Sequence, residues 1–164
     1  MTHTKEATML RHLTTAAAVT LALAGGAGIA TAQDGPFEMQ IAARQGIMAY
    51  RALQLGTLGA MAKGEVDYDA AAAQKAADNL MASVALDGSM LWPQGSDNEA
   101  NPKSEALPAI WADGSDIGAK GKAMVDAATA MQAAAGTGLD GLKTAMGEVG
   151  GACGGCHKAF RVPQ

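Results

Sequence analysis

Residues 139–163 read LDGLKTAMGEVGGACGGCHKAFRVP, and the spacing of the apolar residues in this stretch decides the fold. They recur at alternating intervals of three and four positions, at Leu139, Leu142, Met146, Val149, Cys153, Cys156 and Phe160. Such spacing is typical of the buried face of an α-helix. Pro163 ends the pattern, because proline lacks the amide hydrogen that a continuing helix needs. The stretch therefore predicts a final helix with two cysteines on its buried face.

The same helix carries Cys153-Gly154-Gly155-Cys156-His157, a Cys-x-x-Cys-His motif typical of c-type haem attachment. Two thiols three positions apart lie on one helical turn and can form thioethers with the two haem vinyl groups. The histidine that follows can then bind the iron as the proximal ligand. Residues 33–164 hold no other cysteine or histidine. We predict one covalently bound haem c, attached through Cys153 and Cys156, with His157 as the proximal iron ligand.

Three other uses of the motif fit the sequence less well. A thioredoxin-like redox centre needs a βαβ context, and no part of the chain alternates like a strand. Structural zinc needs about four ligands, whereas two cysteines and one histidine leave no obvious fourth. A plain disulfide would use the two thiols but not the adjacent histidine. Haem attachment uses all three residues.

Residues 1–32 are typical of a secretory signal peptide. Lys5 and Arg11 give a basic start, residues 16–24 are an apolar stretch, and Ala30-Thr31-Ala32 is a small-x-small cleavage pattern. The alternative is an uncleaved membrane anchor, but the segment is short and weakly apolar for a span. We expect cleavage near Ala32/Gln33, export to the periplasm, and no membrane span in the remaining chain. Residues 33–164 are long enough for one domain.

The charge of the expected mature chain restricts its partners. The full sequence has 12 basic and 16 acidic residues, and Lys5, Arg11 and Glu6 belong to the expected signal peptide. Ten basic and fifteen acidic residues remain, a net charge of −5. This charge argues against nucleic acid or anionic membrane surfaces as partners. It agrees with redox partner proteins that have a basic docking patch.

Three further segments have a helical period. The first covers roughly residues 37–62 and has a stripe with alternating spacings of four and three, on one face of a long helix, at Ile41, Gln45, Met48, Ala52, Leu55, Gly59 and Ala62. The second begins near Asp67 or Asp69, either of which can cap a helix, and ends by Asp87-Gly88. A long connection over residues 89–114 follows. The third segment begins at Ser115-Asp116 and stops near residue 136. Short turns favour antiparallel neighbours. We predict an all-α, up-down-up-down four-helix bundle with one long loop between the second and third helices.

These residues together resemble the class II cytochromes c, which include cytochrome c prime. The most specific match is the haem motif and Phe160-Arg161 at the C-terminus, because class I cytochromes c carry that motif near the N-terminus. The supporting matches follow the same order along the chain: Arg44-Gln45, Lys63-Gly64, Tyr68-Asp69, Pro108-Ala109-Ile110-Trp111, Gly147 and Gly150. The resemblance covers essentially all of residues 33–164. It implies a four-helix bundle with the haem near the C-terminus.

The resemblance also implies which residue faces the distal side of the iron. In typical cytochrome c prime members that position on the first helix is a non-coordinating residue such as leucine, and in a low-spin branch it is methionine. Counted four residues on from Arg44, it is Met48, which shares a helix face with Arg44. We expect Met48 to be the distal iron ligand and Arg44 to bind a haem propionate. Arg161 corresponds to the family's basic residue near the proximal ligand, or else complements the helix dipole.

With His157 and Met48 as axial ligands, the chain would be a six-coordinate, low-spin carrier of single electrons and not an enzyme. In the alternative, Met48 only lines an open distal site, as a buried methionine that fills space. The chain would then be a five-coordinate, high-spin protein that binds small gases such as NO and CO. A haem-free helical module is a third alternative. The resemblance also makes a homodimer through the first two helices possible, and Gly56 or Gly59 could allow helices to approach closely.

Overall fold

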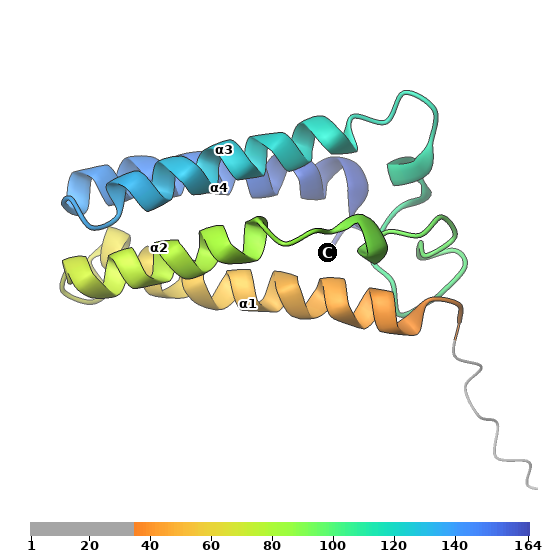
Figure 1. Cartoon of the computed structure of the whole chain (residues 1–164), viewed down its shortest axis with the longest axis horizontal. Coiled ribbons are helices and arrows are strands. Elements are labelled where there is room, and N and C mark those ends of the chain that lie inside the picture. Colours follow the sequence, from red (N-terminus) through yellow and green to blue (C-terminus); the bar gives the residue numbers. More distant parts are fainter. Residues whose placement is uncertain (1–34) are drawn as a thin grey trace, which may run out of the picture. The chain divides into compact units, whose positions relative to one another are not determined.

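The computed structural model describes residues 35–164. The expected signal peptide at residues 1–32 and its cleavage site lie outside this range. The described chain forms four α-helices: α1 (Glu38–Lys63), α2 (Ala70–Val84), α3 (Ile117–Ala134) and α4 (Leu139–Phe160). Figure 1 shows them running alternately up and down, with the long connection between α2 and α3 at one end. This confirms the predicted all-α, up-down-up-down bundle.

Local sequence explains where the helices begin and end. Gly64 follows α1 with φ 75°, a left-handed conformation that glycine adopts without strain. Asp69, one of the two predicted caps, begins α2, and its side chain accepts a hydrogen bond from the Ala72 amide at 2.9 Å. Helix α2 ends at Val84, three residues before the predicted stop at Asp87-Gly88.

The main hydrophobic core fills the end of the bundle where the two short turns lie. Small residues dominate it, and Leu58, Leu80, Met131, Leu142 and Val149 are its largest fully buried members. The Tyr68 hydroxyl donates to the carbonyl oxygen of Ala135 at 2.8 Å, which ties the start of α2 to the end of α3. We call this part of the molecule the closed half.

The opposite end is covered by the long connection, residues 85–116, which we call the crossover loop. It includes two short 3₁₀ turns, η1 (Ser89–Leu91) and η2 (Pro108–Trp111). Ser96, Asn101 and Ser104 in it are buried, so the loop packs onto the bundle. A second, smaller core of Ala106, Ile110 and Phe160 lies beneath it. We call this end the cavity half.

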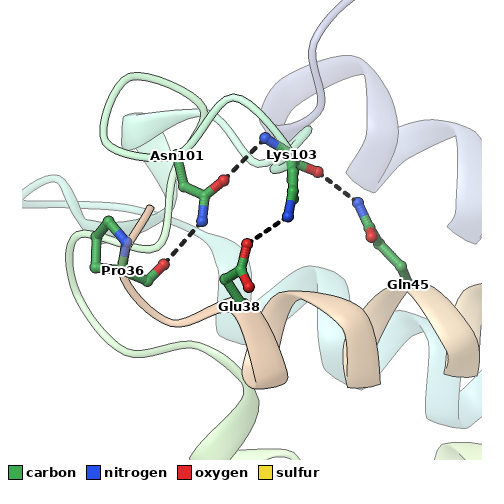
Figure 2. A network of polar contacts seen from close by, with 5 residues as sticks. All are labelled: Pro36, Glu38, Gln45, Asn101 and Lys103. Carbon is green, nitrogen blue, oxygen red and sulfur yellow. Dashed lines mark hydrogen bonds and ion pairs between the residues drawn. The ribbon is translucent and has the colours of Figure 1, made fainter. Parts of the chain in front are cut away.

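Polar contacts fasten the crossover loop to the start of α1 (Figure 2). The Asn101 side chain donates to the Pro36 carbonyl oxygen at 3.0 Å and accepts from the Lys103 amide at 2.9 Å. The Lys103 ammonium pairs with Glu38 at 2.5 Å, and Gln45 donates to the Lys103 carbonyl oxygen at 2.7 Å. The loop is therefore held at several points along the first two turns of α1.

The crossover loop is also joined to the end of α4. The Leu107 amide donates to the Phe160 carbonyl oxygen at 2.9 Å, and the Val162 amide donates to the Glu105 carbonyl oxygen at 2.8 Å. These bonds form an isolated antiparallel bridge between Ala106 and Arg161. They fix the turn of α4 that carries the histidine of the haem motif.

The predicted stripe of α1 was only partly right. Gln45 and Ala52 are exposed, whereas Arg44, Leu58 and Met61 are buried. The reason is that only the second half of α1 packs in the closed half, while the first half faces the crossover loop and a cavity. Across residues 35–164, no helix has both the length and the apolar character needed to span a bilayer.

Candidate haem site

A cavity of about 340 Å³ lies in the cavity half, between α1, α4 and the crossover loop. Helix α4 contributes Cys156, His157 and Phe160 to its wall, and α1 contributes Met48 from the facing side. A second cavity of about 250 Å³ extends toward α2 and α3. Arg44, Met48 and Trp92 line both cavities, so the two adjoin along the same face of α1.

The two cysteines of the motif are free thiols and half-buried. Cys156 lines the larger cavity, and the Cys153 sulfur lies 4.0 Å from the Met124 sulfur of α3. Burial raises the pKa of both thiols above the ordinary value. The thiols are therefore protonated at neutral pH, and they occupy the same face of α4 as the sequence predicted.

His157 is half-buried on the wall of the larger cavity. Burial lowers the pKa of its imidazole, the charge of Arg161 lowers it further, and Glu105 partly opposes them. A lowered pKa favours the neutral imidazole, which is the form that binds a metal. Arg161, four residues on, lines the same cavity, and its backbone lies in the bridge to Ala106.

Met48 lines the same cavity as His157 but comes from the facing helix. Its side chain is 39% exposed, unlike the buried methionines Met61 and Met131 of the closed half. Its position on the cavity wall therefore distinguishes Met48 from a core-filling methionine. The structure brings together the two residues that the sequence predicted as axial ligands, while coordination itself stays a prediction.

Arg44 has a use that the sequence did not reveal. Its Nη1 donates to the carbonyl oxygen of Leu91 at 3.2 Å and to Ser96 Oγ at 2.7 Å. Its Nη2 donates to Ser104 Oγ at 2.6 Å and to the Ser96 carbonyl oxygen. The guanidinium also lies over the Trp92 ring, 4.6 Å from its centroid. Arg44 is therefore the anchor of the crossover loop.

These contacts limit the predicted role of Arg44 toward a haem propionate. A guanidinium has five N–H donors, and four of those of Arg44 are directed to the crossover loop. Only the Nε–H has no partner among residues 35–164. Binding of a propionate by Arg44 stays a prediction, and it would depend on that one donor or on exchange of a loop contact.

The donor set fits a haem. The thiol of Cys156, the imidazole of His157 and the thioether of Met48 line the larger cavity, whose remaining wall is largely apolar, with Ile110, Ile117 and Phe160. The second thiol, Cys153, lies one helical turn earlier on the same helix. Iron held by imidazole and thioether is an established haem arrangement. Within residues 35–164, no three His, Cys, Asp or Glu side chains gather as a metal site. The arrangement suits a macrocycle held by its edge and its iron.

Sequence reasoning missed two residues of this site. Trp92 lines both cavities, and Arg51 lines the second one beside Met48. Arg51 could have been found, because it follows Arg44 by seven positions and Met48 by three and so shares their helix face. Trp92 lies in a loop, where no periodicity indicates which way a side chain faces.

Known proteins agree with this arrangement. The family described as Cytochrome C' matches residues 39–161. Cytochrome c-554 of Cereibacter sphaeroides is 47% identical over 80% of this chain and 87% of its own, and cytochrome c' of the same organism is 41% identical over 81% and 89%. A solved structure of cytochrome c' from Rhodobacter spheriodes has 42% identity and a TM-score of 0.75, covering 77% of this chain and 98% of its own. A nitric oxide complex of a leucine-to-alanine mutant of cytochrome c prime from Alcaligenes xylosoxidans has 30% identity and a TM-score of 0.68, covering 77% and 96%.

The family match covers most of the chain and nearly all of the four-helix bundle. Two of these relatives exceed 40% identity over about four fifths of the sequence. The resemblance inferred from the haem motif is therefore confirmed, and so is the predicted cofactor. This chain belongs to the cytochrome c' family of class II cytochromes c, and is a monohaem c-type cytochrome with one covalently bound haem c.

Proposed function

We propose that this cytochrome carries single electrons, with its haem attached through Cys153 and Cys156 and its iron bound by His157 and Met48. The observation that carries the proposal is the position of Met48, which lines the same cavity as His157 from the facing helix. A thioether in that position can close the distal side of the iron. No coordination site then stays open for a substrate, which agrees with a carrier and not with an enzyme.

Each residue of the site has a distinct task in this proposal. When bound, the haem supplies the one-electron exchange between ferric and ferrous iron. The neutral imidazole of His157 offers a nitrogen to the proximal side, and Arg161 and the bridge to Ala106 keep its helical turn in place. Apolar side chains of Ile110 and Phe160 exclude water from the cavity. Two permanent axial ligands keep the coordination unchanged when the electron is gained or lost.

Binding of small gases to a five-coordinate haem is the second candidate function, and the comparisons favour it. The similar solved structure from Alcaligenes xylosoxidans is a nitric oxide complex of a cytochrome c prime mutant. In this candidate, Met48 would line the distal cavity without binding iron. The thioether would leave room for a diatomic ligand above the haem. The position of Met48 opposite His157 is the reason to place electron transfer first.

Optical spectra of the haem-loaded protein separate the two functions. We expect sharp low-spin bands in both oxidation states and a weak ferric charge-transfer band from sulfur to iron. Met48→Leu should give a high-spin spectrum that responds at once to carbon monoxide. Met124→Leu is a matched control, because Met124 also lines the second cavity, and it should leave the spectrum low-spin. A high-spin wild-type protein that binds carbon monoxide immediately would establish the second function instead.

The sequence supports a cellular location and a class of partner for this protein. We infer a periplasmic protein that begins near Gln33, with a net charge of −5 that suits redox partners with a basic docking patch. The outer face of α1 and α2 has an apolar groove of about 430 Å³ lined by Tyr50 and Leu86, where a second copy could bind. Gly59 faces the bundle, because a Cβ added there would lie 3.6 Å from the Met146 methyl group, so of the two glycines Gly56 and Gly59 only Gly56 is available for a close contact between copies.

A further inference from the structure

Arg51 of α1 is a half-buried cation beside the predicted distal ligand. Its Nε donates to Ser83 Oγ at 3.2 Å and its Nη2 donates to the Ser83 carbonyl oxygen at 2.7 Å. Its remaining terminal nitrogen, Nη1, is directed to Met48 Sδ at 3.9 Å. The two hydrogen bonds to Ser83 fix the orientation of the guanidinium group. In this orientation its Nη1 faces the Met48 thioether.

The end of α2 explains why a cation can lie here. Ser83 belongs to the last turn of α2, whose carbonyl oxygens have no partner within the helix. The C-terminus of a helix carries a partial negative charge, and α2 has no basic residue of its own in its last turn. Arg51 supplies that cation from the neighbouring helix. Among residues 35–164 it pairs with no carboxylate, so its charge is balanced only by the helix end.

The charge of Arg51 acts on the haem site from the second cavity. Arg51, Met48 and Met124 all line that cavity. Burial raises the pKa of the Cys153 thiol, and the charge of Arg51 opposes part of this increase. The guanidinium is therefore close to the predicted distal ligand and to the first predicted attachment point of the haem.

We propose that Arg51 is a positioning residue of the haem site, which holds the Met48 thioether on the distal side and shifts the iron toward its reduced form. This inference rests on the proposed His157 and Met48 ligation. Ferric haem has one more positive charge than ferrous haem, so a nearby uncompensated cation disfavours the ferric state. The electron itself comes from the redox partner. A hydrogen bond to a ligating sulfur would act in the same direction, because it weakens electron donation to ferric iron.

The test compares Arg51→Gln and Arg51→Lys with the wild-type protein in the haem-loaded form. Midpoint potentials from a spectroelectrochemical titration report the charge, and the rate of carbon monoxide binding to the ferrous protein reports how firmly Met48 is held. Lys143→Gln is the control, since it removes one charge from an exposed position of α4. We expect Arg51→Gln to lower the equilibrium constant for reduction at least tenfold, which is 59 mV for one electron. Lys143→Gln should shift it much less.

The lysine variant separates charge from positioning. Arg51→Lys keeps the charge but lacks the planar fork that reaches Ser83 and Met48 together. It should therefore retain most of the potential while carbon monoxide binds several times faster than to wild type. A potential of Arg51→Gln no lower than that of Lys143→Gln would overturn the inference. So would unchanged carbon monoxide binding in Arg51→Lys, which also decides the matter if Arg51→Gln does not retain haem.

Failure of this inference is distinct from failure of the proposed function. The wild-type spectrum and Met48→Leu test ligation without any change at Arg51. A low-spin wild type whose potential is insensitive to Arg51 would leave the proposed function intact and remove the role of Arg51. A high-spin wild type would remove the proposed function and, with it, the positioning of a ligand by Arg51.

Discussion

The closed half and the cavity half of the bundle use the same four helices in opposite ways. In the closed half, Leu58, Leu80 and Leu142 come from three different helices and are fully buried in one hydrophobic cluster with several alanines. In the cavity half, the helix faces are separated by two cavities, and charged residues such as Arg44 and Arg51 take part in the walls. The first half is a complete hydrophobic core, whereas the second is built around a cofactor.

This difference indicates which half stabilises the folded bundle without haem. Burial of apolar area contributes roughly 25 cal/mol per Å², and side chains alone supply that area in the closed half. In the cavity half the macrocycle supplies much of it. The closed half should therefore hold the bundle together without haem, while the crossover loop and the first turns of α1 should depend on haem for their order.

Removing the covalent attachment of the haem should have the largest effect on the cavity half. Cys153→Ser with Cys156→Ser should abolish covalently bound haem completely, because both predicted thioether bonds are lost. The chain should still fold as a helical bundle through its closed half. Haem staining after denaturing electrophoresis and far-ultraviolet circular dichroism measure the two effects. Haem that stays on the denatured double variant would contradict the assignment of both cysteines.

A cavity in the closed half should have the reverse effect. Leu142→Ala removes a fully buried side chain and should lower the free energy of unfolding by about 2–5 kcal/mol. The optical spectrum of the haem should not change, because Leu142 lies outside both cavity walls. Leu53→Ala is the control: Leu53 is 70% exposed, and its loss should change stability by less than about 0.5 kcal/mol. Equal effects of the two substitutions in urea titrations would contradict a separate closed core.

The two halves also differ in how far the sequence predicted them. The closed half follows from local rules: apolar spacing predicts the helix faces, and Asp69 and Gly64 mark where helices begin and end. The haem motif could be predicted equally well, because the residues that carry its chemistry lie within five consecutive positions. Both depend on residues near one another in the chain, so a single stretch is enough to indicate them.

The cavity half was less predictable because its contacts join distant parts of the chain. Arg44 bonds to Ser96 and Ser104, which are 52 and 60 positions away in a loop with no periodicity. Arg44, whose binding of a haem propionate stays a prediction, therefore also anchors the loop. Gln45 and Ala52, expected inside, are exposed for a related reason, since the stripe on α1 was read as if one core ran along the whole helix.

The anchoring role of Arg44 gives the smallest of the expected effects and refines the comparison within the cavity half. Arg44→Met keeps an unbranched apolar stem but removes all four donors to the crossover loop. Buried acceptors such as Ser96 Oγ would lose their hydrogen-bond partner, which costs about 1–3 kcal/mol. Because these acceptors lie in the loop, the loss should appear as local opening. Hydrogen exchange should accelerate over residues 89–111 and stay unchanged in α3. Gln45→Met, which removes one exposed bond to the same loop, should have a much weaker effect; equal acceleration in both variants would mean that Arg44 is not the anchor.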